Sequence, residues 1–170
     1  NKLLKKKLII VYNKFFKKKD MLHTLIMGLK FSNDDTIISY TDIIYSKKLI
    51  NILVKKNEKD IILPVKTDWE KIWKIRGKFN KNDAEALNYD KDLKLKNIGG
   101  KINKKTKSQF MGLIFIPKQK IKKIISIYKK VEKRKLQTTV FLNHLIKNKI
   151  TIKVLPNKEK WYEFYQKDVI

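Results

Sequence analysis

The sequence predicts an α/β fold in which helices cover both faces of a mostly parallel sheet. Two features of the 170 residues lead to this prediction. Short β-branched runs alternate with helix-patterned segments over the first third of the chain, as in βαβ units with right-handed crossovers. The runs are also almost continuously apolar, as strands covered on both faces require.

The first third of the chain is expected to hold three strands and two helices. The strands are predicted at 8–12, 36–40 and 60–65, where short apolar runs occur. Between them, apolar residues recur at helical spacing over 21–30 and 47–56. We expect all three strands, the one at 8–12 included, to be buried in the sheet.

The rest of the chain is expected to add a β-hairpin, three strands and three helices. The hairpin would join 85–89 to 93–98. The strand at 109–116 contains Gly112, and a glycine inside a strand often marks close approach by a ligand or another backbone. The remaining elements are helices at 69–79, 117–134 and 138–147 and strands at 150–155 and 161–165. Because we find no repeat or linker, one domain over 1–170 is the simplest organisation.

The net charge of +26 would ordinarily indicate a nucleic-acid partner. Of the 42 basic residues, however, only Arg76 and Arg134 are arginine, the residue that bidentate phosphate and guanine contacts favour. Lysine is abundant together with Asn and Ile, and all three have A/T-rich codons. We therefore interpret most of the lysines as the product of an A/T-rich coding composition, placed on solvent-exposed faces. Nucleic acid is the less favoured partner.

Composition also excludes several kinds of site. The chain has no cysteine, which excludes disulfides, thiolate catalysis and cysteine-based zinc sites. The two histidines, His23 and His144, lie far apart and form no ligand motif. No segment approaches the roughly 20 apolar residues of a membrane span, and no targeting segment is convincing. We expect a cytoplasmic protein without a membrane partner.

Asp42 stands where open parallel sheets bind their ligands. It follows the β-branched run at 36–40, and ligands bind beyond the carboxyl ends of such strands. A carboxylate there can hold Mg²⁺ against substrate phosphates, although a cap or turn aspartate is the alternative. We predict that Asp42 lies at the end of a central parallel strand and faces a cleft.

A second group of candidate residues follows the third strand. Trp69 and Trp73 share one helix face, for core packing or for substrate recognition. Arg76 suits bidentate binding of phosphate or carboxylate. Asp83 and Glu85 would lie on one side of a strand, where they could bind a substrate cation or hydroxyls, or pair with surface lysines.

Seven short motifs extend this pattern in a fixed order along the chain. They are Ile38–Ile43; Asp68-Trp69 with Trp73 and Arg76; Asp83–Glu85; Ile98-Gly99; Gln109–Leu113; Thr139 with Leu142 and Leu145-Ile146; and Trp161–Phe164. In order and spacing they resemble the phosphocholine, aminoethylphosphonate and sugar nucleotidyltransferases, especially the branch found fused to phosphoenolpyruvate mutase. Their combination is more specific than any one of them.

The resemblance implies a Rossmann-like sheet and Mg²⁺ bound at Asp42. It implies transfer of a nucleotidyl group, expected to be CMP from CTP, to a sugar phosphate, phosphocholine or phosphonate, with release of pyrophosphate. The substrate-binding residues it implies are Trp69, Trp73, Arg76, Asp83, Glu85 and Gly112.

Two departures from the family pattern qualify this expectation. The family's glycine-rich loop ending in Arg, which wraps the triphosphate, has no counterpart here, so we expect an N-terminally incomplete domain that folds marginally. The family's second metal aspartate is replaced by Tyr165, and Asp168 follows three residues later. Either a deletion shifts the register and makes Asp168 the second metal ligand, or that ligand is lost. The alternatives are an inactive truncated homologue and a basic nucleic-acid-binding module.

Overall fold

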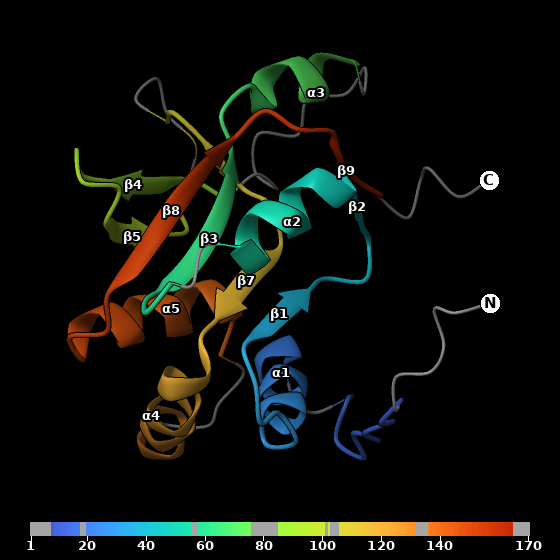
Figure 1. The fold of residues 1–170 in the computed structure, drawn as a ribbon, viewed down its shortest axis with the longest axis vertical. Coiled ribbons are helices and arrows are strands. Elements are labelled where there is room, and N and C mark those ends of the chain that lie inside the picture. Colours follow the sequence, from blue (N-terminus) through green and yellow to red (C-terminus); the bar gives the residue numbers. More distant parts are fainter. Residues whose placement is uncertain are drawn as a thin grey trace.

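A mixed five-stranded sheet forms the centre of the protein, which we describe from a computed structural model. The described residues are 8–17, 20–55, 58–75, 85–100, 102, 106–131 and 136–164. The strands of the sheet are β1 (Thr36–Ser39), β3 (Ile61–Lys66), β6 (Gln109–Phe110), β7 (Leu113–Ile116) and β8 (Ile152–Asn157). Figure 1 shows β3 and β8 side by side, with β7 and β1 beyond them.

The direction of one segment corrects the prediction of a mostly parallel sheet. β3 and β8 are parallel along their whole length, but β7 is antiparallel to both β1 and β3. β6 is also antiparallel to β3, so the segment 109–116, predicted as one strand, forms two short ones. Continuous apolar runs indicate that both faces of a strand are covered, but they carry no information about the direction of its neighbour.

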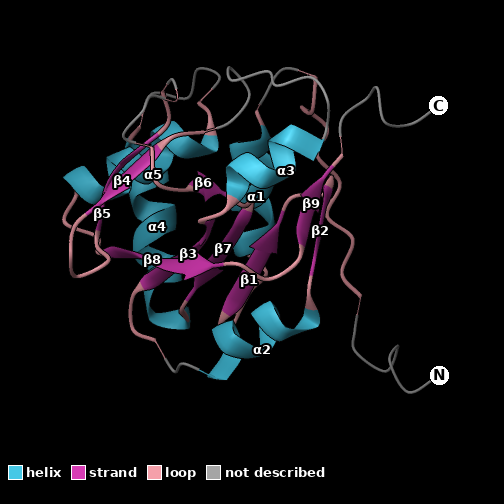
Figure 2. Cartoon of the chain, turned by 90° about the horizontal axis from the view of Figure 1, so that it is seen from above, coloured by secondary structure: helices cyan, strands magenta, loops and turns pink. Residues whose placement is uncertain are grey.

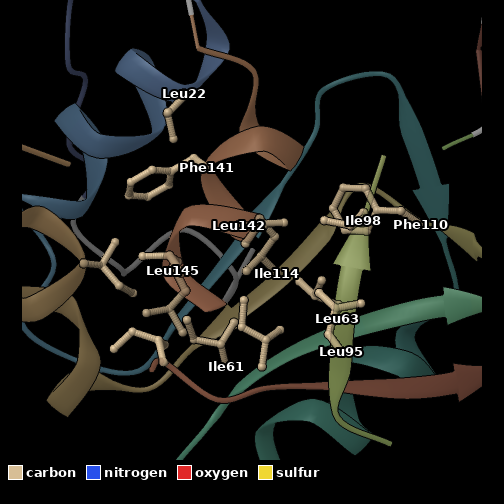
Figure 3. Close-up of a cluster of buried hydrophobic side chains, with 14 of the residues drawn as sticks. Leu22, Ile61, Leu63, Leu95, Ile98, Phe110, Ile114, Phe141, Leu142 and Leu145 are labelled. Atoms are coloured by element: carbon tan, nitrogen blue, oxygen red, sulfur yellow. The ribbon is translucent and has the colours of Figure 1, made fainter. Parts of the chain in front are cut away.

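Helices cover both faces of the sheet, as predicted (Figure 2). On one face lie α1 (Met21–Leu29), α4 (Lys118–Lys130) and α5 (Thr138–Lys147), which enclose the largest group of buried side chains (Figure 3). On the other lies α2 (Lys47–Lys55), whose Leu53 packs against Ile62 and Phe115. The helical spacing of apolar residues therefore identified the faces that are buried.

Some elements outside the sheet were predicted, and one strand was not. The hairpin of β4 (Leu87–Tyr89) and β5 (Leu95–Ile98) confirms the prediction, and α3 (Trp69–Ile75) begins where expected. The ladder of β2 (Ile43–Tyr45) and β9 (Trp161–Glu163) joins distant parts of the chain. No strand was predicted at β2, because a three-residue strand has too few positions to show a period.

The predicted buried strand at 8–12 is wrong. These residues form no strand, and the side chains of Leu8 and Ile10 are 81% and 84% exposed. A strand needs a paired neighbour, and the segment finds none among the described residues. The residues that follow are nevertheless bound to α1, because Asn13 Nδ2 donates a hydrogen bond to Thr24 Oγ1 at 2.8 Å.

β1 is an edge strand within the described chain. The backbone N–H of Tyr40 donates to the carbonyl of Gly112 at 3.0 Å, and pairing alternates along an antiparallel ladder. The backbone groups of Ile37 and Ser39 therefore point away from β7.

None of the helices within the described ranges is long and apolar enough to cross a membrane.

Candidate active site

A cleft of about 410 Å³ opens beyond the end of β1, between the start of α5 and the β2–β9 ladder. Four carboxylates line it, together with two aromatic rings and three polar residues at the start of α5. The lining residues are Asp20, Met21, Tyr40, Thr41, Asp42, Glu85, Gln109, Phe110, Gly112, Gln137, Thr138, Thr139 and Glu163.

Asp42 lies in the turn between β1 and β2, at the edge of this cleft. Its backbone carbonyl accepts a hydrogen bond from the N–H of Phe164 at 2.8 Å, and Ile43 pairs with Glu163 in the β2–β9 ladder. The cleft was expected, but the central parallel strand was not found, since β1 is an edge strand with an antiparallel neighbour. The ladder brings Asp42 and Glu163 to the same cleft.

A buried lysine holds the loop that leads into β9. Lys66 is 3% exposed, and its Nζ donates to the carbonyls of Lys158 at 2.9 Å and Glu159 at 2.8 Å. The same Nζ forms an ion pair with Asp68 at 2.9 Å, which helps to hold the pKa of that carboxyl below its usual range against the opposing effect of burial. Lys66 thereby positions the strand that carries Glu163.

Tyr40 forms the aromatic floor of the cleft. Burial raises the pKa of its phenol to about 12; the carboxylates of Glu85, Asp42 and Glu163 act in the same direction, and the nearby Thr138 hydroxyl opposes them. Its ring meets that of Phe110 edge-on, with centroids 5.9 Å apart. The phenol is therefore neutral at physiological pH.

Gly112 allows the ring of Tyr40 to lie against the backbone. Its φ of +74° is in the left-handed region, and a Cβ there would lie 3.2 Å from two ring carbons of Tyr40 and 3.3 Å from Ile43 Cδ1. The close neighbour of this glycine is thus the side chain of Tyr40, rather than the ligand or second backbone that was expected, at a position that also lines the cleft.

The start of α5 supplies polar groups whose bonding is incomplete. Thr138 is 3% exposed, and its Oγ1 makes no hydrogen bond of ordinary geometry in the described chain. Gln137, at the N-cap position, makes no side-chain capping bond. Burial raises the pKa of Glu85, and its hydrogen bond with Thr139 opposes that effect.

The predicted site residues fall into three groups. Asp42, Glu85 and Gly112 line one cleft. Trp69 is buried at the start of α3 and is not among the described residues lining the cleft, while Trp73 belongs to α3 but its side chain lies outside what the structure describes. Arg76, Asp83 and Asp168 lie outside the described residues.

Other residues of the site had no assigned role in the sequence. Glu163 stood in the last motif and Tyr40 in the first, while Thr138 carries no local signal of a cleft. Lys66 looked like one more lysine of a basic chain. Its place inside the continuously buried β3 was the available signal, since an unpaired lysine is almost never fully buried.

Comparison with known proteins finds similar cytidylyltransferases and CTP transferases. No family model matches the chain. It is 25% identical over 168 aligned residues to the CTP:phosphoglutamine cytidylyltransferase of Campylobacter jejuni, covering 89% of this chain and 66% of that protein. The inositol-1-phosphate CTP transferase from T. maritima superposes with a TM-score of 0.75 at 15% identity, over 95% of this chain and 62% of that one.

A second solved structure has the same architecture. The CTP:phosphocholine cytidylyltransferase from Streptococcus pneumoniae gives a TM-score of 0.61 at 15% identity, over 91% of this chain and 62% of that one. The chain has a nucleotidyltransferase fold. It spans about two-thirds of the length of these proteins.

Proposed function

We propose that the protein transfers CMP from CTP to a small phosphorylated acceptor and releases pyrophosphate. The observation that carries this proposal is the cleft in which the β2–β9 ladder holds Asp42 and Glu163, within a nucleotidyltransferase fold. The sequence similarity to a cytidylyltransferase supports CTP as the donor. The basic surface of the rest of the chain would attract both anionic substrates.

The reaction needs no protein nucleophile. A phosphate or phosphonate oxygen of the acceptor attacks the α-phosphorus of CTP, and a new P–O bond forms there. The bond from the α-phosphorus to the oxygen that bridges to the β-phosphorus breaks, and pyrophosphate leaves with that electron pair. The protein contributes positioning and the stabilisation of charge, as in other phosphoryl-transfer reactions.

The residues present fit a single Mg²⁺ ion shared with substrate. No three acidic, histidine or cysteine side chains converge into a metal cage anywhere in the described ranges. Mg²⁺, however, commonly takes only one or two carboxylates and completes its shell with substrate phosphates and water. Asp42 and Glu163 would hold it here, and the bound ion would neutralise phosphate charge. Asp168 as a further ligand stays a prediction.

Pyrophosphate release tests this proposal directly. The protein is incubated with CTP, Mg²⁺ and phosphocholine, aminoethylphosphonate or sugar phosphates, and pyrophosphate is measured. Asp42→Asn should lower kcat by about 10²–10³-fold, the usual cost of losing one preorganised electrostatic group. The matched control is Asp34→Asn, because the Asp34 side chain is 93% exposed and lies outside the cleft.

The assay separates the alternatives. Release that is unaffected by Asp42→Asn would contradict the proposed site. Binding of CTP without turnover of any acceptor would favour an inactive homologue. Salt-sensitive binding of any polyanion, with no affinity for CTP, would favour a nucleic-acid-binding module.

A further inference from the structure

The ladder that brings Asp42 and Glu163 to one cleft is separate from the central sheet. Among the described strands, β2 and β9 pair only with each other, through three residue pairs (Figure 2). A two-stranded ladder of this length is marginally stable by itself. Other contacts must therefore hold it where both carboxylates line the cleft.

The two carboxylates differ in how closely the chain joins them to the sheet. Asp42 follows two residues after Tyr40, whose backbone N–H donates to the carbonyl of Gly112 at 3.0 Å and so continues the pairing of β1 with β7. Glu163 lies in β9, which is reached from β8 only through the loop 158–160. The position of Glu163 therefore depends on what holds this loop and the start of β9.

Lys66 attaches the loop to the end of β3. Its ammonium group has three N–H donors, and three oxygens lie within 2.9 Å of Nζ: the carbonyls of Lys158 and Glu159 and Oδ1 of Asp68. The side chain is 3% exposed, so little water reaches Nζ. Removing the ammonium group would leave these acceptors without their partner, which costs more than the contacts contribute when they are made.

Trp161 provides a second attachment at the start of β9. Its indole Nε1 donates to the backbone carbonyl of Met111 at 2.9 Å, and the side chain is 5% exposed. Met111 lies between β6 and β7, directly before Gly112. Lys66 and Trp161 thus join β9 and its loop to two different parts of the central sheet.

We propose that Lys66 and Trp161 are positioning residues of the metal site, which hold β9 so that Glu163 can bind one Mg²⁺ together with Asp42. This inference rests on the proposed function, because it concerns the metal of the same reaction. Neither side chain is among the described residues that line the cleft, so both act through Glu163. They set the fraction of molecules in which the ladder is docked, and apparent metal affinity falls with that fraction.

Metal binding tests the role of the ammonium group. Lys66→Met nearly keeps the length of the side chain and removes its charge. We expect Mg²⁺ to bind at least about tenfold more weakly, as measured by calorimetry with α,β-methylene-CTP, which cannot be turned over. Saturating Mg²⁺ should restore kcat for pyrophosphate release to within about twofold, because bound metal favours the docked ladder. A variant that was merely less folded would lose kcat at every Mg²⁺ concentration.

Hydrogen exchange reports the docking without metal or activity. The amides of Ser46 and Phe164 donate to the carbonyls of Lys160 at 3.0 Å and Asp42 at 2.8 Å. In Lys66→Met both amides should exchange at least about tenfold faster, because local opening becomes easier. The amide of Tyr40, bonded to the sheet itself, should keep its protection.

Trp161→Phe tests the same inference with a milder change. It keeps an aromatic ring and removes the N–H donor to Met111. Loss of this one hydrogen bond should weaken Mg²⁺ binding by about fivefold and speed exchange of the Phe164 amide. This variant decides the question if Lys66→Met does not fold.

Lys153→Met is the matched control. Lys153 lies on the neighbouring strand β8 and forms ion pairs with Glu58 at 3.6 Å and Asp60 at 3.3 Å, but it is not among the described residues of the cleft. Its side chain is partly exposed, so its loss should leave Mg²⁺ affinity and the exchange of Phe164 within about twofold.

The outcomes separate this inference from the proposed function. Unchanged Mg²⁺ affinity in Lys66→Met and Trp161→Phe, in a protein that releases pyrophosphate, would overturn the inference and leave the function standing, even if exchange became faster. An unaltered protein that neither binds Mg²⁺ nor releases pyrophosphate would overturn both.

Discussion

The apolar core beneath α1, α4 and α5 differs from the acidic cleft beside it in the kind of side chain that each gathers. The core consists of close-packed apolar side chains such as Leu63 and Leu145 (Figure 3). The cleft gathers four carboxylates, a phenol whose pKa is about 12 and a buried hydroxyl without an ordinary hydrogen bond. The first region stabilises the fold by apolar packing, whereas the second brings ionisable and polar groups together in an open cleft. Substitutions in the two regions should therefore differ in size and even in sign.

The largest effect is expected in the core. Leu63 is fully buried in β3, and Leu63→Ala should lower the free energy of unfolding by about 2–5 kcal/mol through lost burial and the cavity left behind. Urea denaturation measures the change. The control is Val54→Ala on the exposed side of α2, expected to stay within about 0.5 kcal/mol. Similar losses for both variants would mean that the core does not dominate stability.

A smaller loss is expected where the cleft meets the sheet. Gly112→Ala places a side chain at a left-handed φ and against the ring of Tyr40, which should cost about 1–3 kcal/mol. Gly28→Ala is the matched control, because nothing lies within 4 Å of its Cβ position and α1 is helical there. That change should stabilise by up to about 1 kcal/mol, as measured by thermal unfolding. A neutral Gly112→Ala would show that Tyr40 is free to move.

The smallest effect is expected to have the opposite sign. The folded-state pKa of Glu85 is raised above its ordinary value near 4.5, so ionisation of this carboxyl destabilises the fold as pH rises through that range. At pH 7 Glu85→Gln should therefore stabilise the ligand-free protein slightly. The gain should shrink as pH falls below about 4.5, where both states are protonated. Unfolding of both proteins across this range measures it.

Either of two results would weaken the comparison between core and cleft. A loss of stability in Glu85→Gln that does not change with pH would mean that the carboxylate is a structural partner of Thr139. A gain in stability accompanied by unchanged pyrophosphate release would separate the electrostatic cost of Glu85 from catalysis.

The sequence predicted most elements because their signals are local. Helical spacing indicated α1, α2 and α5 nearly to their ends, and apolar runs indicated β3 and β8. Three of the predicted site residues, Asp42, Glu85 and Gly112, line one cleft. The same local signals misled at 8–12, where a β-branched run has no strand beside it.

By itself, then, the sequence determined which segments are helical or extended and which of their faces are apolar, because side-chain periodicity is a property of neighbouring residues. Only the tertiary structure decided that β7 runs against β1 and β3, that Lys66 holds the loop before β9, and that Glu163 and Asp42 line one cleft. Each of these depends on contacts between segments far apart in the chain. Such contacts form when buried surfaces and backbone groups find partners, and no local pattern encodes which partner that is.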